Sequence, residues 1–170
     1  MRLKFLFSCL TVLTIVVSGS ATSPSDSAIV RLGDLEQLCG KKWSGTLTYL
    51  DYKSAKPVDL KCNLQVVRSD VKNKWKMSYE YTDEPRANRT SDITLSDYGK
   101  MVDDETVVSR NQSKHKIVTV VTERNGLDDY KPAKMTYTYV LGTSEFSIKK
   151  EVCFEGSMDK IVRNTYSWRR

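Results

Sequence analysis

Residues 134–154 read KMTYTYVLGTSEFSIKKEVCF and carry the pattern that decides the fold. The odd positions from Met135 to Leu141 are apolar or aromatic, Lys134 precedes them, and threonine stands between most of them. After Gly142-Thr143 the alternation resumes at Phe146, now with apolar residues at even positions. Successive side chains of a strand point to opposite faces, so a period of two indicates strands with one buried and one wet face. The stretch therefore predicts two antiparallel strands joined by a tight turn.

The same period of two recurs along the chain. Residues 43–49, 58–66 and 75–81 each alternate between apolar or aromatic and polar side chains. Short turn-forming segments separate them, which favours pairing between sequence neighbours. The predicted fold class is all-β: an antiparallel up-and-down meander β-barrel of about 8–10 strands. About nine strands are recognisable, and a closed antiparallel meander needs an even number. Either the region 100–121 holds another strand or one segment lies outside the barrel.

The N-terminal residues predict export. Residues 1–21 begin with Met-Arg-Leu-Lys, continue as a short apolar run without charge and end in small residues, as a cleaved signal peptide does. The apolar run is shorter than the roughly 20 residues that span a membrane. We expect a secreted or periplasmic protein with a signal peptide over 1–21. A flexible segment and a short helix follow over 22–42, and the β-barrel domain over 43–170.

The charge distribution and the cysteine spacing argue against nucleic acid and metal ions as partners. The net charge is +6, but basic and acidic residues are interleaved, so nucleic acid is not an expected partner. Beyond the leader the cysteines are Cys39, Cys62 and Cys153, and their spacing fits no metal site. Export favours one disulfide and leaves one thiol unpaired. Strand parity places Cys62 inside and Cys153 outside, which favours Cys39 as the partner of either.

The segment LCGKKWSG at 38–45 resembles the opening of the calycin barrels, the group that contains lipocalins and fatty-acid-binding proteins. In lipocalins a short helical turn precedes Gly-x-Trp, whereas here Gly40 and Trp43 are one residue further apart. The chain is also similar to uncharacterised exported bacterial proteins with a comparable start and an Arg-Asn-x-Tyr-like end. The resemblance implies that an arginine near the last strand, Arg163 or Arg169, packs over Trp43 and closes the barrel's end. A plain core tryptophan with exposed arginines is the alternative.

The buried face of the predicted barrel is rich in tyrosine and tryptophan. The ligand-binding candidates on this face are Trp75, Tyr79, Tyr81, Tyr137, Tyr139 and Tyr166. A buried tyrosine hydroxyl needs a hydrogen-bond partner, so several of them favour a cavity that holds water or a ligand. Barrels of about 8 strands can hold one small ligand. Hydroxyls that bond to one another, or that lie at a barrel mouth, are the alternative.

Lys150 is a further ligand-binding candidate because it shares the strand face of Phe146 and Val152. A lysine aimed at an apolar interior is costly unless it is paired. Three roles stay open: contact with an anionic ligand such as a carboxylate, pairing with an acid of the chain such as Asp51, and a β-bulge that turns the side chain outward.

The sequence has no G-x-S-x-G, H-E-x-x-H or phosphate-binding glycine loop, and its acidic runs lie in predicted loops. His115, the only histidine, is expected to be exposed. We expect no catalysis, metal or cofactor, but a secreted barrel that binds a small apolar or amphipathic molecule in its lumen, without stable membrane insertion. The alternatives are a protein-interaction or inhibitor module with a filled barrel, an enzyme that uses loop carboxylates, and a barrel whose apolar face meets lipid. The oligomeric state is left open.

Overall fold

The computed structural model describes residues 28–170 of the chain, so the signal peptide expected over 1–21 lies outside the described residues. The helical elements are α1 (Leu32–Glu36) and the 3-10 turn η1 (Pro85–Ala87). The strands are β1 (Lys42–Asp51), β2 (Lys56–Arg68), β3 (Lys74–Tyr81), β4 (Arg89–Thr94), β5 (Met101–Val102), β6 (Glu105–Gln112), β7 (Val118–Asp128), β8 (Lys131–Leu141), β9 (Glu145–Phe154) and β10 (Ile161–Arg169).

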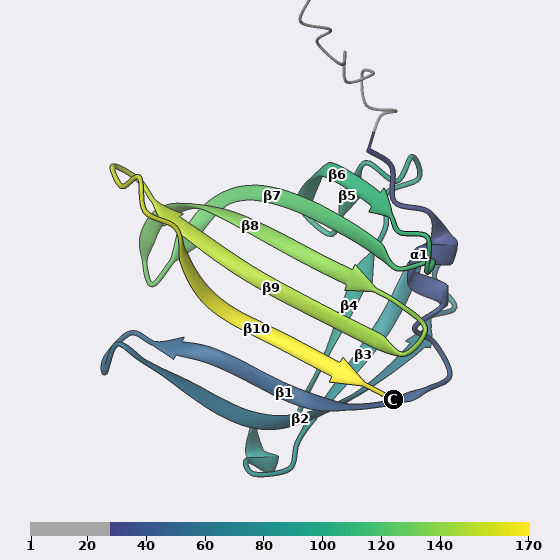
Figure 1. The fold of residues 1–170 in the computed structure, drawn as a ribbon, viewed down its shortest axis with the longest axis horizontal. Helices are drawn as coiled ribbons and strands as arrows, with labels where there is room; N and C mark the ends of the chain where they lie inside the picture. Colours follow the sequence, from purple (N-terminus) through teal and green to yellow (C-terminus); the bar gives the residue numbers. More distant parts are fainter. Residues whose placement is uncertain (1–27) are drawn as a thin grey trace, which may run out of the picture.

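All ten strands form one antiparallel sheet in the order β4-β3-β2-β1-β10-β9-β8-β7-β6-β5. The first and last strands pair with each other, from Ser44↔Arg169 to Tyr49↔Asn164, which curls the meander into a barrel (Figure 1). The predicted all-β meander barrel is therefore confirmed. The strand count is even because the two-residue strand β5 precedes β6 in the region 100–121.

The two edges of the sheet, β4 and β5, meet at a seam that makes the barrel nearly closed. Leu95 and Val102 form an isolated antiparallel bridge there. Beside it, the backbone N–H of Thr94 donates to Asp103 Oδ1 at 2.7 Å, and the Asp103 N–H donates to the Thr94 carbonyl at 2.7 Å. The pairing across the seam is thus short, whereas the neighbouring strands pair over most of their length.

The apolar faces of the strands line the inside of the barrel, as the period of two predicts. The end beside α1 is packed with large side chains, among them Trp43, Trp75, Phe146 and Trp168, each at most 1% exposed. We call this end the closed half. The expected barrel interior is therefore solid at this end.

Helix α1 caps the closed half, and the predicted short helix is confirmed (Figure 1). Leu35 and Leu38 are buried in the core, and the Leu38 carbonyl accepts a hydrogen bond from Trp43 Nε1 at 3.0 Å. The Asp34 carboxylate accepts a hydrogen bond from the backbone N–H of Arg31 at the start of the helix. The same carboxylate accepts two hydrogen bonds, of 2.8 and 2.7 Å, from the guanidinium of Arg110 in β6. This nearly buried, bidentate ion pair ties the helix to the sheet.

The described cysteines form no disulfide. Cys39, Cys62 and Cys153 are free thiols, so the expectation of one bridge is wrong. The predicted positions of two of them are confirmed, because Cys62 is buried among core residues whereas Cys153 is partly exposed. Over residues 28–170 no helix has the length and apolar character needed to span a membrane, and no group of three or more His, Cys, Asp or Glu side chains is arranged to hold a metal ion.

Candidate functional site

The end of the barrel opposite α1 differs from the closed half. The hairpin loops β1–β2, β7–β8 and β9–β10 surround it (Figure 1). Four side chains on the inner strand faces, Tyr49, Leu60, Tyr137 and Ile148, pack against the core and are still partly exposed to solvent. We call this region the open half. The open half therefore differs from the closed half in that several of its inward-facing side chains are partly exposed, although Met135 and Val152 at the same end are completely buried.

A polar cluster lies at the mouth of the open half, and we name it the Asp128 cluster after its central residue. Lys150 Nζ lies 2.5 Å from Asp128 Oδ1, and the Tyr52 hydroxyl donates to Asp128 Oδ2 at 2.6 Å. Arg163 Nε lies 3.7 Å from the same carboxylate, and its guanidinium lies 4.2 Å from the centre of the Tyr52 ring. Burial raises the pKa of Asp128, but hydrogen bonds from Lys150 and Tyr52 outweigh this effect and hold it below its usual value.

The Asp128 cluster shows which of the three roles left open for Lys150 applies. The lysine points inward and pairs with an acid of the chain, but the acid is Asp128 at the end of β7, not Asp51. Asp51 accepts hydrogen bonds from Lys53 and Ser54 within its own turn. Because Lys150 is neutralised inside the chain, it is not an unpaired cation in the lumen.

A buried acid occupies the middle of the barrel. Glu105 Oε2 accepts hydrogen bonds from the Thr122 hydroxyl at 2.5 Å and from the Tyr139 hydroxyl at 2.8 Å. Burial raises the pKa of Glu105, and these two donors offset part of the rise. The acidic run at residues 103–105 is one of those that the sequence places in a solvated loop, and this prediction is wrong for Glu105, which is the first residue of β6 and faces inward.

Arg124 lies close to this acid, near the seam. Its Nη1 contacts Asp104 Oδ2 at 2.9 Å, and its Nε donates to the Tyr137 hydroxyl at 3.3 Å. The Tyr137 side chain is therefore held at the edge of the open half by an arginine that is itself paired.

Three tyrosines and one arginine form a second cluster, which we call the Arg89 cluster. The hydroxyls of Tyr81 and Tyr166 lie 2.9 Å apart, and Arg89 Nη2 donates to the Tyr166 hydroxyl at 3.0 Å. The Arg89 guanidinium also lies 4.6 Å from the centre of the Tyr79 ring. Burial raises the pKa of Tyr79 to about 12. All four residues lie on the inner faces of β3, β4 and β10.

The ligand-binding candidates predicted from sequence are divided by the structure. Trp75 is completely buried in the closed half, and Tyr139 binds Glu105 in the middle. Tyr137 belongs to the open half and Lys150 to the Asp128 cluster, while Tyr79, Tyr81 and Tyr166 come together around Arg89.

The arginine over Trp43 is neither of the two expected. Arg170 lies 5.9 Å from the Trp43 ring centre, and Lys41 lies 6.0 Å from it. Arg163 instead covers Tyr52 in the Asp128 cluster. Arg169 is exposed because Trp168, its neighbour on the strand, faces inward. The tryptophan does lie beneath a cation near the chain's end, but the contributing residue is the last one.

Sequence reasoning missed Tyr52, Arg89, Arg124 and Asp128. One signal was available for Arg89: it shares strand parity with the buried Ile93 of β4. The others could not be placed without the register, because their partners lie on strands far away in sequence.

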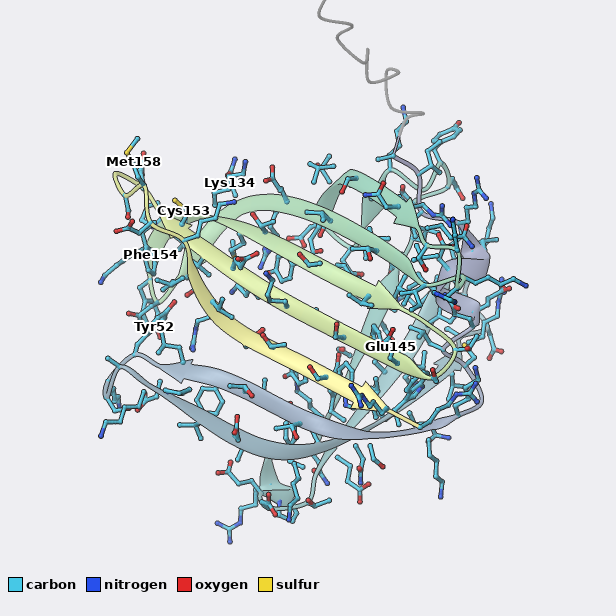
Figure 2. The ribbon with its side chains drawn as sticks, viewed as in Figure 1. Tyr52, Lys134, Glu145, Cys153, Phe154 and Met158 are labelled. Carbon is cyan, nitrogen blue, oxygen red and sulfur yellow. The ribbon has the colours of Figure 1, made fainter. Side chains whose placement is uncertain are left out.

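A surface hollow of about 460 Å³ lies at the rim of the open half. Its wall combines Gly126 and Ala133 with the outward-facing Lys134 and Cys153 and the loop after Phe154. Figure 2 shows Lys134, Cys153 and Phe154 at the end of the sheet that carries Met158, across from Tyr52. The Cys153 thiol donates to the Ser157 carbonyl at 3.3 Å, so this thiol helps to hold the β9–β10 loop.

The comparisons with known proteins identify a fold but no family. No protein-family model and no curated protein matches the chain. Among solved structures, the chain is similar to the crystal structure of Rv2717c from M. tuberculosis, with a TM-score of 0.55 and 12% identity. The match covers 84% of this chain and 98% of that one. At this identity the likeness concerns the barrel fold alone.

Proposed function

We propose that this protein is an exported barrel that binds a small, partly apolar molecule in the open half of its interior and performs no catalysis. The observation that carries the proposal concerns four side chains that face inward and are nevertheless partly exposed to solvent: Tyr49, Leu60, Tyr137 and Ile148. Exposed apolar surface inside a concave site is the usual setting for a small ligand. The tyrosine hydroxyls nearby supply the few polar contacts that such a ligand needs.

The test has two parts: detection of a natural ligand, and a variant in which a larger side chain blocks the lumen. Native mass spectrometry of the protein purified from its host should show a bound small molecule. An environment-sensitive apolar dye should bind to the wild type, and Ile148→Trp should abolish binding by filling the open half. Lys149→Trp is the matched control, because the neighbouring residue faces outward. If both variants bind the dye as the wild type does, the lumen is not the site.

A second function has its own supporting observation. Tyr130 in the β7–β8 turn is 96% exposed, and Met158 in the β9–β10 loop is 100% exposed, so large apolar side chains project from the rim. Such residues suit a protein-interaction or inhibitor module. An empty barrel in the dye experiment, together with a protein partner lost on Tyr130→Ser and Met158→Ser, would favour this alternative.

A further inference from the structure

The positive charge of the described chain is concentrated at one end of the barrel. Alternate connections of an up-and-down meander lie at the same end, so α1, the loops β2–β3, β4–β5, β6–β7 and β8–β9, and the C-terminus all lie outside the closed half (Figure 1). We call this outer surface the basic end, and it consists of residues 28–42, 68–73, 95–100, 110–117, 142–145 and 169–170. These residues include 11 lysines and arginines against 5 aspartates and glutamates, whereas the rest of residues 28–170 includes 14 against 15. The net positive charge of the described residues therefore lies at the basic end.

Most cations of the basic end have no acid partner. Three of them form ion pairs within this end: Arg68–Glu36, Lys72–Asp97 and Arg110–Asp34. The other eight have no carboxylate of residues 28–170 within ion-pair distance. Arg31, Lys100 and Lys114 are among these eight, and all three are exposed. Like charges that gather on one surface repel one another, so this surplus favours an anionic partner.

Exposed apolar side chains stand among these cations. Ile29, Leu32 and Tyr98 line a surface hollow of about 330 Å³ and are 38%, 39% and 81% exposed. Arg31 and Lys72 line the same hollow. Tyrosine and aliphatic side chains flanked by lysine and arginine are the composition of a surface that contacts lipid headgroups and the acyl chains just beneath them.

The backbone beneath this apolar patch is held in place. The N–H of Val30 donates to the Gly99 carbonyl at 2.9 Å, and a Cβ atom at Gly99 would collide with the Val30 carbonyl. The Asn73 carbonyl accepts the N–H of Leu95 at 2.9 Å, which joins the β2–β3 loop to the β4–β5 loop. Segments that are already ordered lose little conformational entropy when they bind a surface.

We propose that the basic end docks onto the surface of a bilayer that contains anionic lipids, without crossing it. The unpaired lysines and arginines would contact the headgroups, and Ile29, Leu32 and Tyr98 would enter the interface. The apolar patch favours a bilayer over nucleic acid, since contacts to a phosphate backbone come from charged and polar groups. Docking by this end leaves the open half facing the water, so the inference is independent of lumen binding.

The experiment measures cosedimentation of the protein with lipid vesicles. It uses residues 22–170, so that the expected signal peptide contributes no apolar segment of its own. The vesicles consist of phosphatidylcholine alone or of phosphatidylcholine with phosphatidylglycerol, at low and at high salt. We expect at least about tenfold tighter binding to the anionic vesicles at low salt, and a smaller preference at high salt, because salt screens exposed charges.

A pair of double variants tests where the charge acts. Lys100→Glu with Lys114→Glu reverses two exposed charges of the basic end and should lower the affinity for anionic vesicles at least about tenfold. Lys53→Glu with Lys160→Glu is the matched control, because it makes the same change in net charge on exposed loops at the opposite end. The control should keep most of the affinity. Both double variants should bind the apolar dye as the wild type does, which separates this test from that of the lumen.

A second pair of variants tests the apolar contact and covers the case in which a double variant fails to fold. Tyr98→Ser should weaken binding to anionic vesicles several-fold, and the loss should persist at high salt, because an apolar contact is not screened. Tyr130→Ser, at an equally exposed tyrosine of the opposite end, is the matched control and should bind as the wild type does.

Three outcomes would overturn the proposal. Equal binding of the wild type to both kinds of vesicle would remove the role of anionic lipid. An equal loss in the two double variants would show that net charge is responsible and not the basic end. Tighter binding to a DNA duplex than to anionic vesicles, with no effect of Tyr98→Ser on the vesicles, would assign the basic end to nucleic acid instead.

Discussion

Glu105 is a carboxyl group on the inner face of the barrel, with Thr122 and Tyr139 as its hydrogen-bond partners. Burial raises its pKa in the folded chain above that of an unfolded glutamate. The folded state therefore prefers the protonated form. Stability from this group is complete below the unfolded pKa and is lost as the pH rises through the folded pKa.

We predict that Glu105→Gln, which does not ionise, becomes more stable relative to the wild type as the pH rises. The measurement is the free energy of unfolding from urea denaturation at pH 4, 6 and 8. Glu80→Gln, on an exposed side chain of β3, is the control and should show a smaller trend. A difference between Glu105→Gln and the wild type that does not change with pH would contradict the prediction.

Asp128 behaves in the opposite way, because its pKa in the folded chain is lowered overall: burial raises it, and hydrogen bonds from Lys150 and Tyr52 more than compensate. Its contribution to stability is present above the unfolded pKa and is lost as the pH falls toward the lower folded pKa. Asp128→Asn should destabilise the fold by about 3 kcal/mol at pH 7, because it leaves Lys150 without its partner in a site where both side chains are largely buried.

The double variant Asp128→Asn with Lys150→Met checks this explanation. It should be more stable than Asp128→Asn alone, since the unpaired charge is gone. The difference between the wild type and Asp128→Asn should also shrink in unfolding measurements below about pH 4. A single variant as stable as the wild type at pH 7 would show that the ion pair contributes nothing.

At the scale of elements, the pairing of β1 with β10 closes the meander, and Gly45 allows the two strands to approach. A Cβ atom at residue 45 would lie 1.9 Å from the Ser167 carbonyl oxygen, which is backbone and cannot rotate away. The strand segment around Trp168 therefore tolerates no side chain at this position.

Gly45→Ala should destabilise the protein by about 1–3 kcal/mol or more, because the two strands must separate to admit the methyl group. Gly33→Ala in α1 is the matched control: a Cβ there meets nothing within 4 Å, and alanine should stabilise the helix by about 0.5–1 kcal/mol. Thermal unfolding followed by circular dichroism measures both. Equal effects of the two substitutions would show that the close approach has no energetic importance.

The elements also show what sequence reasoning can reach. Alternation is a local property, so β1, β2, β3, β8 and β9 were recognisable from their own residues. The two-residue strand β5 has no pattern long enough to detect, and its pairing at the seam depends on Asp103 and Thr94 meeting. The short helix was predictable because Leu32, Leu35 and Leu38 recur at helical spacing and Gly40 stands where a helix would end.

The partners of individual side chains could not be predicted from the local sequence. The choice of Asp128 over Asp51 for Lys150 depends on where β7 ends relative to β9, which is a matter of register and not of local sequence. The tyrosines of the Arg89 cluster were predicted to face inward, and they do. That Arg89 gathers them was not predicted, because β4 is short and only weakly alternating.

At the scale of the whole molecule, the described barrel is held together without a covalent cross-link. Cys39, Cys62 and Cys153 are separate thiols. We therefore predict the same melting temperature with and without a reducing agent. A melting temperature that falls on reduction would indicate a disulfide. In the native state, a thiol reagent should modify Cys153 well before Cys62, because burial raises the pKa of the Cys62 thiol and shields it.

The division of the barrel into a closed half and an open half has an evolutionary consequence. The large side chains that stabilise the fold, such as Trp43, Phe146 and Trp168, lie together at one end. Under the proposed function, replacements of Tyr137 or Ile148 at the other end would alter what the interior accepts at less cost to folding than replacements in the closed half, because these two side chains are only partly buried. On that proposal, a lineage carrying this barrel would acquire new specificities through a few substitutions at the mouth while its scaffold stays constant.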